Sequence, residues 1–256
     1  MVRLNKYMSE AGVCSRREAD RLIEQGRVTV DGVRAVTGQQ VEKDQKIELD
    51  GKPVKKDKKE KPILLAVNKP RGVVCSEVSQ GNDVNIIEFL NYPKRITYAG
   101  RLDKDSEGLL LMTNQGDLIN QMMRGANHHE KEYEVVVDRP FNERFLKDMA
   151  AGIYLKELDV TIRPCEVERL GKRKFRIVLT QGLNRQIRRM CQELGYHVQE
   201  LKRLRIMNIR LGHLKTGTWR NVTPEELEEL TYLLEHPEEE TGLESTVGIS
   251  EDRGDR

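Results

Sequence analysis

The 256-residue chain has no long apolar run. Its longest, residues 63–67, is far shorter than the roughly 18 residues that cross a membrane. Residues 1–6 lack the apolar core of a secretory signal. We therefore expect a cytoplasmic protein without a membrane partner.

Cysteine and histidine are also scarce. The four cysteines lie far apart, with no Cys-x-x-Cys spacing: Cys14, Cys75, Cys165 and Cys191. This pattern suggests neither a disulfide framework nor a zinc site, so we expect free thiols in a reducing cytosol. His128 and His129 are adjacent, so they would point apart on any regular element, and no third ligand is near in sequence. We expect no metal site.

The net charge of +2 conceals a strong separation of charge along the chain. Residues 172–220 carry thirteen Lys or Arg against two acids, a net charge of +11. Residues 224–256 have a net charge of −10, and residues 1–61 one of +4. A basic body suggests a polyanionic partner, because phosphate contacts supply most sequence-independent affinity for nucleic acid. A solvated charged face would give the same counts, so charge alone leaves both interpretations open.

Residues 1–60 have the pattern of a small α+β module. Ser15 followed by Glu18 forms a capping box, which predicts a helix starting there. Gly26 is well placed to end that helix in a left-handed conformation. The dipeptide at 31–32, Asp-Gly between valine-rich runs, predicts a two-residue hairpin.

This module resembles the S-four-type RNA-binding domain, which occurs in a ribosomal protein, a tRNA synthetase family and several RNA-modifying enzymes. The resemblance is carried by residues 3–7, 14–20, 26–28 and 30–32. It implies that the helix with Arg16 and Arg17 faces RNA, in agreement with basic residues gathered on one helical face. The lysine-rich residues 52–62 are then expected to form a charged, extended linker.

From residue 62 onward the pattern predicts a second α+β domain. The expected strands cover residues 63–67, 73–74, 109–111, 133–137 and 175–180. The expected helices cover residues 85–90, 117–123, 186–194 and 225–234. Helices at uneven intervals among many strands favour a mixed, mostly antiparallel sheet flanked by helices. The expected parts are the module at 1–60, this domain at 61–235 and an acidic, disordered tail at 236–256.

Asp103 follows Arg101 and Leu102 in a loop, just before an apolar run typical of a buried strand. A carboxylate on a loop that enters a rigid strand can touch a ligand and still be held in place. Asp is also common in turns and caps, where it forms local hydrogen bonds. The position alone leaves a structural and a catalytic role open.

Five ordered stretches of the second domain resemble the RsuA family of RNA pseudouridine synthases. They are Asn-Lys-Pro-Arg-Gly at 68–72, Gly-Arg-Leu-Asp at 100–103, residues 108–114, Glu-Lys-Glu-Tyr at 130–133 and Gln-Gly-Leu-Asn-Arg-Gln-Ile-Arg-Arg-Met at 181–190. With the leading module, the resemblance extends from residue 1 to about residue 235. The stretches Asp-Lys-Asp-Ser and Asn-Arg-Gln-Ile-Arg-Arg-Met-Cys most resemble the RluF subgroup, which modifies large-subunit ribosomal RNA.

The resemblance implies isomerisation of uridine to pseudouridine without a metal or an organic cofactor. Asp103 would be the catalytic aspartate, acting as nucleophile or as base at the sugar. It must be ionised, and the family places a basic residue for this at Arg188, which could pair with it bidentately. Arg185 and Arg189 would instead face RNA phosphates or solvent.

Two further roles follow from the resemblance. Tyr133 would stack on the target base and assist removal of its carbon-bound proton, although a core tyrosine fits the same strand position. Arg101 would help to hold the base out of its helix, which costs least in a loop or bulge. The expected substrate is therefore a loop of 23S ribosomal RNA, with tRNA as a second candidate, and the expected state is a monomer.

Two alternatives remain open. A non-catalytic RNA-binding or ribosome-assembly factor would use the same basic surface without needing Asp103 near Arg188 and an aromatic ring. A synthase acting on tRNA or on small-subunit ribosomal RNA would share every motif, because the choice of base depends on loop shape and on how two domains dock.

Overall fold

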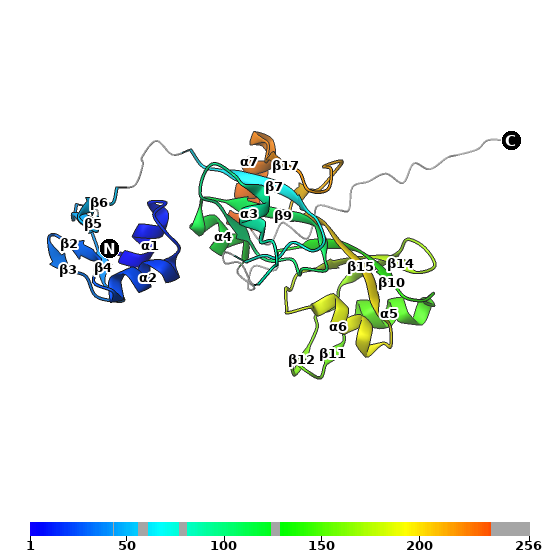
Figure 1. The fold of residues 1–256 in the computed structure, drawn as a ribbon. Helices are drawn as coiled ribbons and strands as arrows, with labels where there is room; N and C mark the ends of the chain where they lie inside the picture. Colours follow the sequence, from blue (N-terminus) through cyan, green and yellow to red (C-terminus); the bar gives the residue numbers. More distant parts are fainter. Residues whose placement is uncertain (43, 56–60, 77–80, 124–128, 237–256) are drawn as a thin grey trace. The chain divides into compact units, whose positions relative to one another are not determined.

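The computed structural model describes residues 1–42, 44–55, 61–76, 81–123 and 129–236. It divides into two compact units (Figure 1). The N-terminal module comprises the described residues of 1–63 with two short segments, 93–95 and 114–116, and the large domain contains the other described residues. Apart from His236, the predicted acidic tail lies outside the described residues.

The N-terminal module packs two helices against short antiparallel strands. The helices are α1 (Leu4–Glu10) and α2 (Arg16–Glu24). The four-stranded sheet has the order β3-β2-β5-β6, with β2 (Val28–Val30), β3 (Val33–Arg34), β5 (Ile47–Leu49) and β6 (Lys52–Pro53). A separate pair joins β1 (Val2–Arg3) to β4 (Gln40–Val41). Helices and strands share one apolar core, so the module has the α+β structure predicted for it.

Local signals in the sequence explain these elements. The Ser15 hydroxyl accepts a hydrogen bond from the Glu18 amide (3.2 Å), which confirms the predicted start of α2. Gly26 ends the helix with φ +72°, as predicted. Asp31 and Gly32 both have positive φ (51° and 80°), which the tight hairpin between β2 and β3 requires.

The predicted linker starts too early in the sequence. Residues 52 and 53 form β6, which pairs with β5, and Val54 is only 7% exposed. The apolar Val54 side chain joins the core of the module, so the first part of the lysine-rich segment belongs to the folded unit. Residues 56–60 lie outside the described part.

The large domain is built on a nine-stranded sheet. Its main path has the order β13-β14-β10-β15-β9-β7-β17, while β8 pairs with β9 and β16 pairs with β15. The strands are β7 (Leu64–Lys69), β8 (Thr97–Ala99), β9 (Glu107–Thr113), β10 (Lys131–Val137), β13 (Glu166–Arg169), β14 (Lys174–Leu179), β15 (Val198–Ile206), β16 (Ile209–Arg210) and β17 (Trp219–Asn221). Every pairing is antiparallel except that of β9 with β15.

Helices cover this sheet through two apolar cores (Figure 1). One core joins α5 (Glu143–Ala151) and α6 (Gln186–Glu193) to β10 and β14. The other joins α4 (Gly116–Met123) and α7 (Pro224–Glu235) to β7 and β9. A short α3 (Ile86–Leu90) and a hairpin of β11 (Tyr154–Leu155) with β12 (Val160–Thr161) complete the domain.

The predicted fold class is confirmed as α+β with a mixed, mostly antiparallel sheet flanked by helices. The four predicted helices are present within one or two residues of their expected bounds. The strand expected at 73–74 is wrong, because Val74 forms only an isolated bridge with Asn85. For β15 the pattern left a pocket wall and a core strand equally open at Leu204 and Ile206, because two buried positions of this strand hold Arg203 and Arg205 in place of apolar residues.

Candidate active site

Asp103 lies in the loop that joins β8 to β9, and this loop is anchored at several points. Leu102 is buried, and the Ser106 amide donates a hydrogen bond to the Asp103 carbonyl oxygen (3.1 Å). The Gly72 amide donates to the carbonyl oxygen of Lys104 (2.7 Å). The Asp103 side chain itself remains 34% exposed. The carboxylate is therefore accessible from solvent on a loop whose backbone is held.

Lys69 supports this loop from the end of β7, although the sequence did not single it out as a site residue. The side chain is fully buried, and Nζ donates to the carbonyl oxygens of Pro70 and Ser106, both at 2.9 Å. Burial lowers the pKa of the Lys69 ammonium, while the carboxylates of Asp103 and Asp105 act in the opposite direction. The available signal was a lysine just before a Pro-x-Gly turn at the end of a buried strand.

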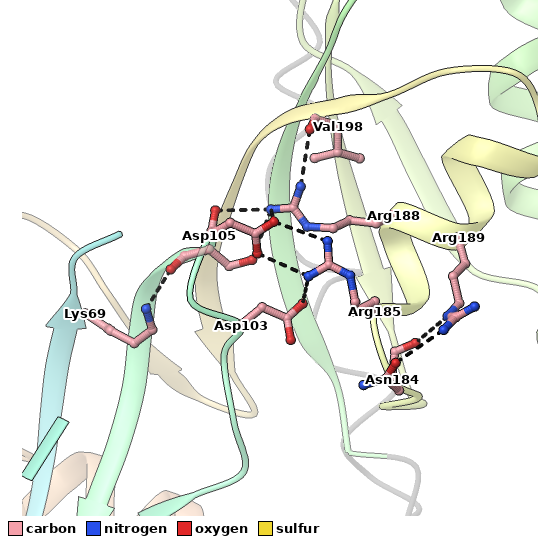
Figure 2. Close-up of polar contacts among 9 residues, drawn as sticks. Lys69, Asp103, Asp105, Asn184, Arg185, Arg188, Arg189 and Val198 are labelled. Atoms are coloured by element: carbon pink, nitrogen blue, oxygen red, sulfur yellow. Dashed lines mark hydrogen bonds and ion pairs between the residues drawn. The ribbon is translucent and has the colours of Figure 1, made fainter. Parts of the chain in front are cut away.

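Arg185 is the guanidinium that contacts Asp103. Its Nη1 lies 3.4 Å from Asp103 Oδ2. The same guanidinium also donates to Asp105, from Nη1 to Oδ1 at 3.3 Å and from Nη2 to Oδ2 at 3.2 Å (Figure 2). Arg185 precedes α6 in a left-handed conformation, with φ +50°. This conformation is uncommon for a residue with a side chain, and such strain is often found at functional sites.

Arg188 reaches the same loop by another route. Its Nη2 lies 3.3 Å from Asp105 Oδ2, 3.1 Å from the Asp105 carbonyl oxygen and 3.3 Å from Ser106 Oγ. Its Nη1 donates to the Val198 carbonyl oxygen (3.2 Å), and the side chain is only 13% exposed (Figure 2). Arg188 therefore ties α6 to the backbone of the Asp103 loop.

The predicted direct pair between Arg188 and Asp103 is wrong, and so is the prediction that Arg185 faces away from Asp103. The left-handed Arg185 changes the direction of the chain at the start of α6, and its side chain meets Asp103. Asp105 was expected only to cap the loop, but its carboxylate is shared by both arginines.

The charges of this cluster reinforce one another. Burial raises the pKa of the Asp105 carboxyl, but hydrogen bonds from Arg185 and the charge of Arg188 outweigh it, so the pKa lies below its usual value. The hydrogen bond to Asp105 raises the pKa of Arg185. Burial lowers the pKa of Arg188. The cluster thus presents ionised Asp105 and cationic Arg185 beside the Asp103 carboxylate at neutral pH.

Tyr133 lies in β10, opposite Arg203 of β15 and Ile177 of β14. It is partly buried against the core, and the Arg203 guanidinium carbon lies 6.0 Å from the centre of its ring. Arg101 is exposed, and its carbonyl oxygen accepts a hydrogen bond from Arg203 Nη1 (3.5 Å). Arg203 therefore contacts both the Tyr133 ring and the loop that carries Asp103.

The remaining candidate arginines lie elsewhere. Arg189 pairs with Glu157 and donates to the Asn184 carbonyl oxygen (3.0 Å), so it takes no part in the Asp103 cluster. Arg16 and Arg17 are exposed at the start of α2 in the N-terminal module. Their guanidiniums make no hydrogen bond or ion pair with any described residue.

Beside α2 the N-terminal module has a hollow of about 360 Å³. Its walls are mostly polar or basic: Met1, Val2, Arg3, Asn5, Lys6, Arg16 and Gln40. Lys6 pairs with Glu10 at 3.4 Å, whereas the guanidiniums of Arg3 and Arg16 are unpaired among the described residues. An anionic group would find unsatisfied donors there.

No cluster of three or more His, Cys, Asp or Glu residues in the described parts of the chain is arranged to hold a metal ion. Similarly, none of the described helices has the length and apolar character needed to cross a membrane. The side chains gathered at the Asp103 loop are carboxylates and guanidiniums, which can supply nucleophilic attack, proton transfer and stabilisation of negative charge.

Family models match both units of the chain. The model described as RNA pseudouridylate synthase matches residues 63–193, and the model described as S4 domain matches residues 2–47. The first includes Asp103, Tyr133 and Arg188, and the second includes Arg16 and Arg17.

Individual relatives match over nearly the whole chain. The dual-specificity RNA pseudouridine synthase RluF of Escherichia coli (strain K12) is 48% identical over 239 residues, which cover 93% of this chain and 81% of that protein. The ribosomal large subunit pseudouridine synthase B of Bacillus subtilis (strain 168) is 36% identical over 92% of this chain and 98% of that protein. A crystal structure of a pseudouridylate synthase has a TM-score of 0.66 at 29% identity and covers 90% of this chain and 100% of that one.

Proposed function

Because the chain belongs to the family of RNA pseudouridine synthases, we propose that Asp103 is the carboxylate with which it isomerises uridine in RNA. The predicted family, with its leading RNA-binding module, and the predicted enzyme class are confirmed. A purely non-catalytic RNA-binding role is thereby set aside. The observation that carries the assignment of Asp103 is its accessible carboxylate on an anchored loop, 3.4 Å from the Arg185 guanidinium.

The reaction needs a group at the sugar and a group at the base. The bond from uracil N1 to the sugar C1′ breaks, C5 then bonds to C1′, the proton on C5 leaves and N1 gains a proton. An ionised Asp103 can attack C1′ as nucleophile or remove a sugar proton as base, and either route divides a difficult step into easier ones. Arg185 contacts this carboxylate at 3.4 Å, and Arg188 acts as a positioning residue by holding the loop.

Tyr133 would contact the base, stacking on it and assisting removal of the C5 proton. This role is supported by the partly exposed position of Tyr133 on β10, beside the Arg203 guanidinium that also binds the Asp103 loop. The exposed Arg101 guanidinium would help to keep the target nucleotide out of its helix. Neither role requires a metal or an organic cofactor.

RNA would be held by unpaired cations of the N-terminal module. Arg16, with Arg3, lines the hollow beside α2, and Arg17 lies next to it in the sequence. Phosphate oxygens would complete the hydrogen bonds that these guanidiniums lack in the described structure. Near Asp103, the partly exposed Arg185 would also meet backbone phosphates, and so would Arg189.

The substrate would be a loop of large-subunit ribosomal RNA, with tRNA as a second possible target. The names of two relatives support this choice, since one is a ribosomal large subunit synthase and the other a dual-specificity RNA synthase. The enzyme would act as a monomer in the cytoplasm. Chemical mapping of pseudouridine in total RNA from a deletion strain identifies the target, because the target position then holds unmodified uridine.

The decisive variant is Asp103→Asn. The amide has nearly the same shape but cannot act as nucleophile or base, so we expect turnover to fall on the order of 10⁴-fold with RNA affinity unchanged. Tritium release from C5-labelled RNA measures turnover, and filter binding measures affinity. Asp148→Asn, at an exposed ion pair on α5, is the matched control. Full activity in Asp103→Asn would remove this residue from the mechanism.

A further inference from the structure

Arg203 is a buried arginine with an unusual set of partners. It lies in β15 and is only 3% exposed. Arg205, two residues further along the same strand, pairs with Glu130 at 2.9 Å and with Glu132 at 3.0 Å. No carboxylate among the described residues pairs with Arg203. Its buried charge is therefore not explained by a salt bridge.

The partners of Arg203 are two carbonyl oxygens on either side of Asp103, one in the loop and one in β9. Nε donates to the carbonyl oxygen of Leu109 (2.7 Å), and Nη1 donates to that of Arg101 (3.5 Å). One planar guanidinium thus joins the loop backbone two residues before Asp103 to the β9 backbone six residues after it. A rigid fork of donors fixes the separation of two acceptors better than a single flexible ammonium does.

The same residue faces the strand of Tyr133. Arg203 and Tyr133 are directly opposite each other in the pairing of β15 with β10, and the guanidinium carbon is 6.0 Å from the ring centre. A cation at this distance from an aromatic face is attracted to it. Arg203 is therefore a mechanical link between the loop of the carboxylate and the strand of the aromatic ring.

The backbone of Arg203 is in close contact with the loop as well. Gly108 is opposite Arg203 in the parallel pairing of β9 with β15, and it has φ +104°. A Cβ atom at Gly108 would lie 2.3 Å from the Arg203 carbonyl oxygen, so only glycine fits. Both the backbone and the side chain of Arg203 thus fix the end of the Asp103 loop.

The position is held at a cost to stability. Nη2 of Arg203 is buried and has no hydrogen-bond partner among the described residues. An unsatisfied buried donor on an unpaired charge is unfavourable, and an apolar side chain of similar length would avoid this cost. Such unfavourable features are retained where geometry serves function.

We propose that Arg203 is a positioning residue that sets the placement of Asp103 relative to Tyr133. It touches neither the sugar nor the base, and it acts through the carbonyl oxygens of Arg101 and Leu109 and through the tyrosine ring. This inference rests on the proposed roles of Asp103 and Tyr133. It adds a residue for which the sequence motifs suggested no role.

The first test compares Arg203→Lys and Arg203→Gln with the wild type. Both variants keep a donor for one carbonyl but lose the fork, so we expect kcat to fall about 10- to 100-fold. KM for RNA should stay within about twofold, because the phosphate-binding cations are untouched. Single-turnover rates at saturating RNA and thermal unfolding are measured on the same full-length preparations.

Arg205→Lys is the matched control, since it changes another buried arginine of β15 that does not bond to the loop. Its kcat should remain within about twofold of the wild type. Equal losses in Arg203→Lys and Arg205→Lys would overturn the proposal, because they would reflect a general cost of altering the strand. Wild-type kcat in a folded Arg203→Lys variant would overturn it as well.

The second test is a double-mutant cycle of Arg203→Lys with Tyr133→Phe. If Arg203 acts through Tyr133, the double variant should lose less activity than the product of the two single losses. Strictly multiplicative losses would contradict this part of the link. The proposed function is tested separately by Asp103→Asn, and full activity in that variant would refute it. The Arg203 variants are compared only with the wild type, so their outcome bears on the positioning role alone.

Discussion

Two sets of arginines, one in each unit of the molecule, differ in whether their guanidiniums already have partners in the described structure. In the N-terminal module, the guanidiniums of Arg3, Arg16 and Arg17 are unpaired among the described residues. In the large domain, Arg185, Arg188 and Arg203 all bond to the loop that carries Asp103. A charge that must meet phosphate is useful when it is free, whereas a charge that defines geometry is useful when it is already held.

The comparison predicts that mutations in the held and in the free arginines have different effects. Loss of a held arginine should lower kcat, because the position of the carboxylate is disturbed. Loss of a free arginine should weaken RNA binding and change its dependence on salt. After Asp103→Asn, the largest effects are therefore expected at the large-domain arginines.

Arg188→Gln removes contacts with Asp105, Ser106 and Val198 from a side chain that is only 13% exposed. We expect kcat to fall about 10²- to 10³-fold, because the loop loses its link to α6. The unfolding temperature should fall by about 4–8 °C, since buried hydrogen bonds are lost. Single-turnover assays and calorimetry measure the two effects. An unchanged unfolding temperature would show that Arg188 does not hold the loop.

Arg185→Gln removes the direct partner of Asp103 but from a side chain that is 42% exposed. We expect a loss in kcat of about 10- to 100-fold, smaller than that of Arg188→Gln, with little change in the unfolding temperature. The matched control is Arg144→Gln, at an exposed ion pair on α5. If Arg185→Gln kept full activity, the contact with Asp103 would have no catalytic value.

The double variant Arg16→Gln with Arg17→Gln tests the free set. We expect affinity for RNA to fall about tenfold, and the slope of log affinity against log salt to become shallower by about 1.4–1.8. kcat at saturating RNA should not change. Arg27→Gln is the matched control, because Arg27 already pairs with Asp50. Equal effects of the control would mean that only the total charge of the module matters.

The smallest effect is expected for Asp105→Asn, which removes a carboxylate shared by two arginines. The folded protein lowers the pKa of Asp105 below its ordinary value of 3.8, so its ionised form stabilises the fold at higher pH. We expect the variant to unfold about 1–3 °C below the wild type at pH 7. This difference should shrink as the pH falls below 3.8, where the wild-type carboxyl gains its proton. Calorimetry across this range checks the prediction, and a constant difference would contradict it.

Much of the local structure follows from short signals in the sequence. The Ser15 cap, the Asp31-Gly32 hairpin and the helix at 186–194 depend on residues near one another in the chain, so their patterns were sufficient. The strand β15 was left undecided because arginines occupy buried positions that a strand pattern expects to be apolar. One of these arginines is Arg203, the proposed positioning residue.

The sequence by itself determined the family, the α+β class and the loop that carries Asp103, because motifs and turn signals are local. Only the tertiary structure decided which arginine contacts that carboxylate, since Asp103 and Arg185 are 82 residues apart and the left-handed turn before α6 selects the contact. It also decided that Lys69 is buried against the loop and that Arg203 joins the loop to β9. These contacts depend on the pairing of distant strands, which no short stretch of sequence specifies.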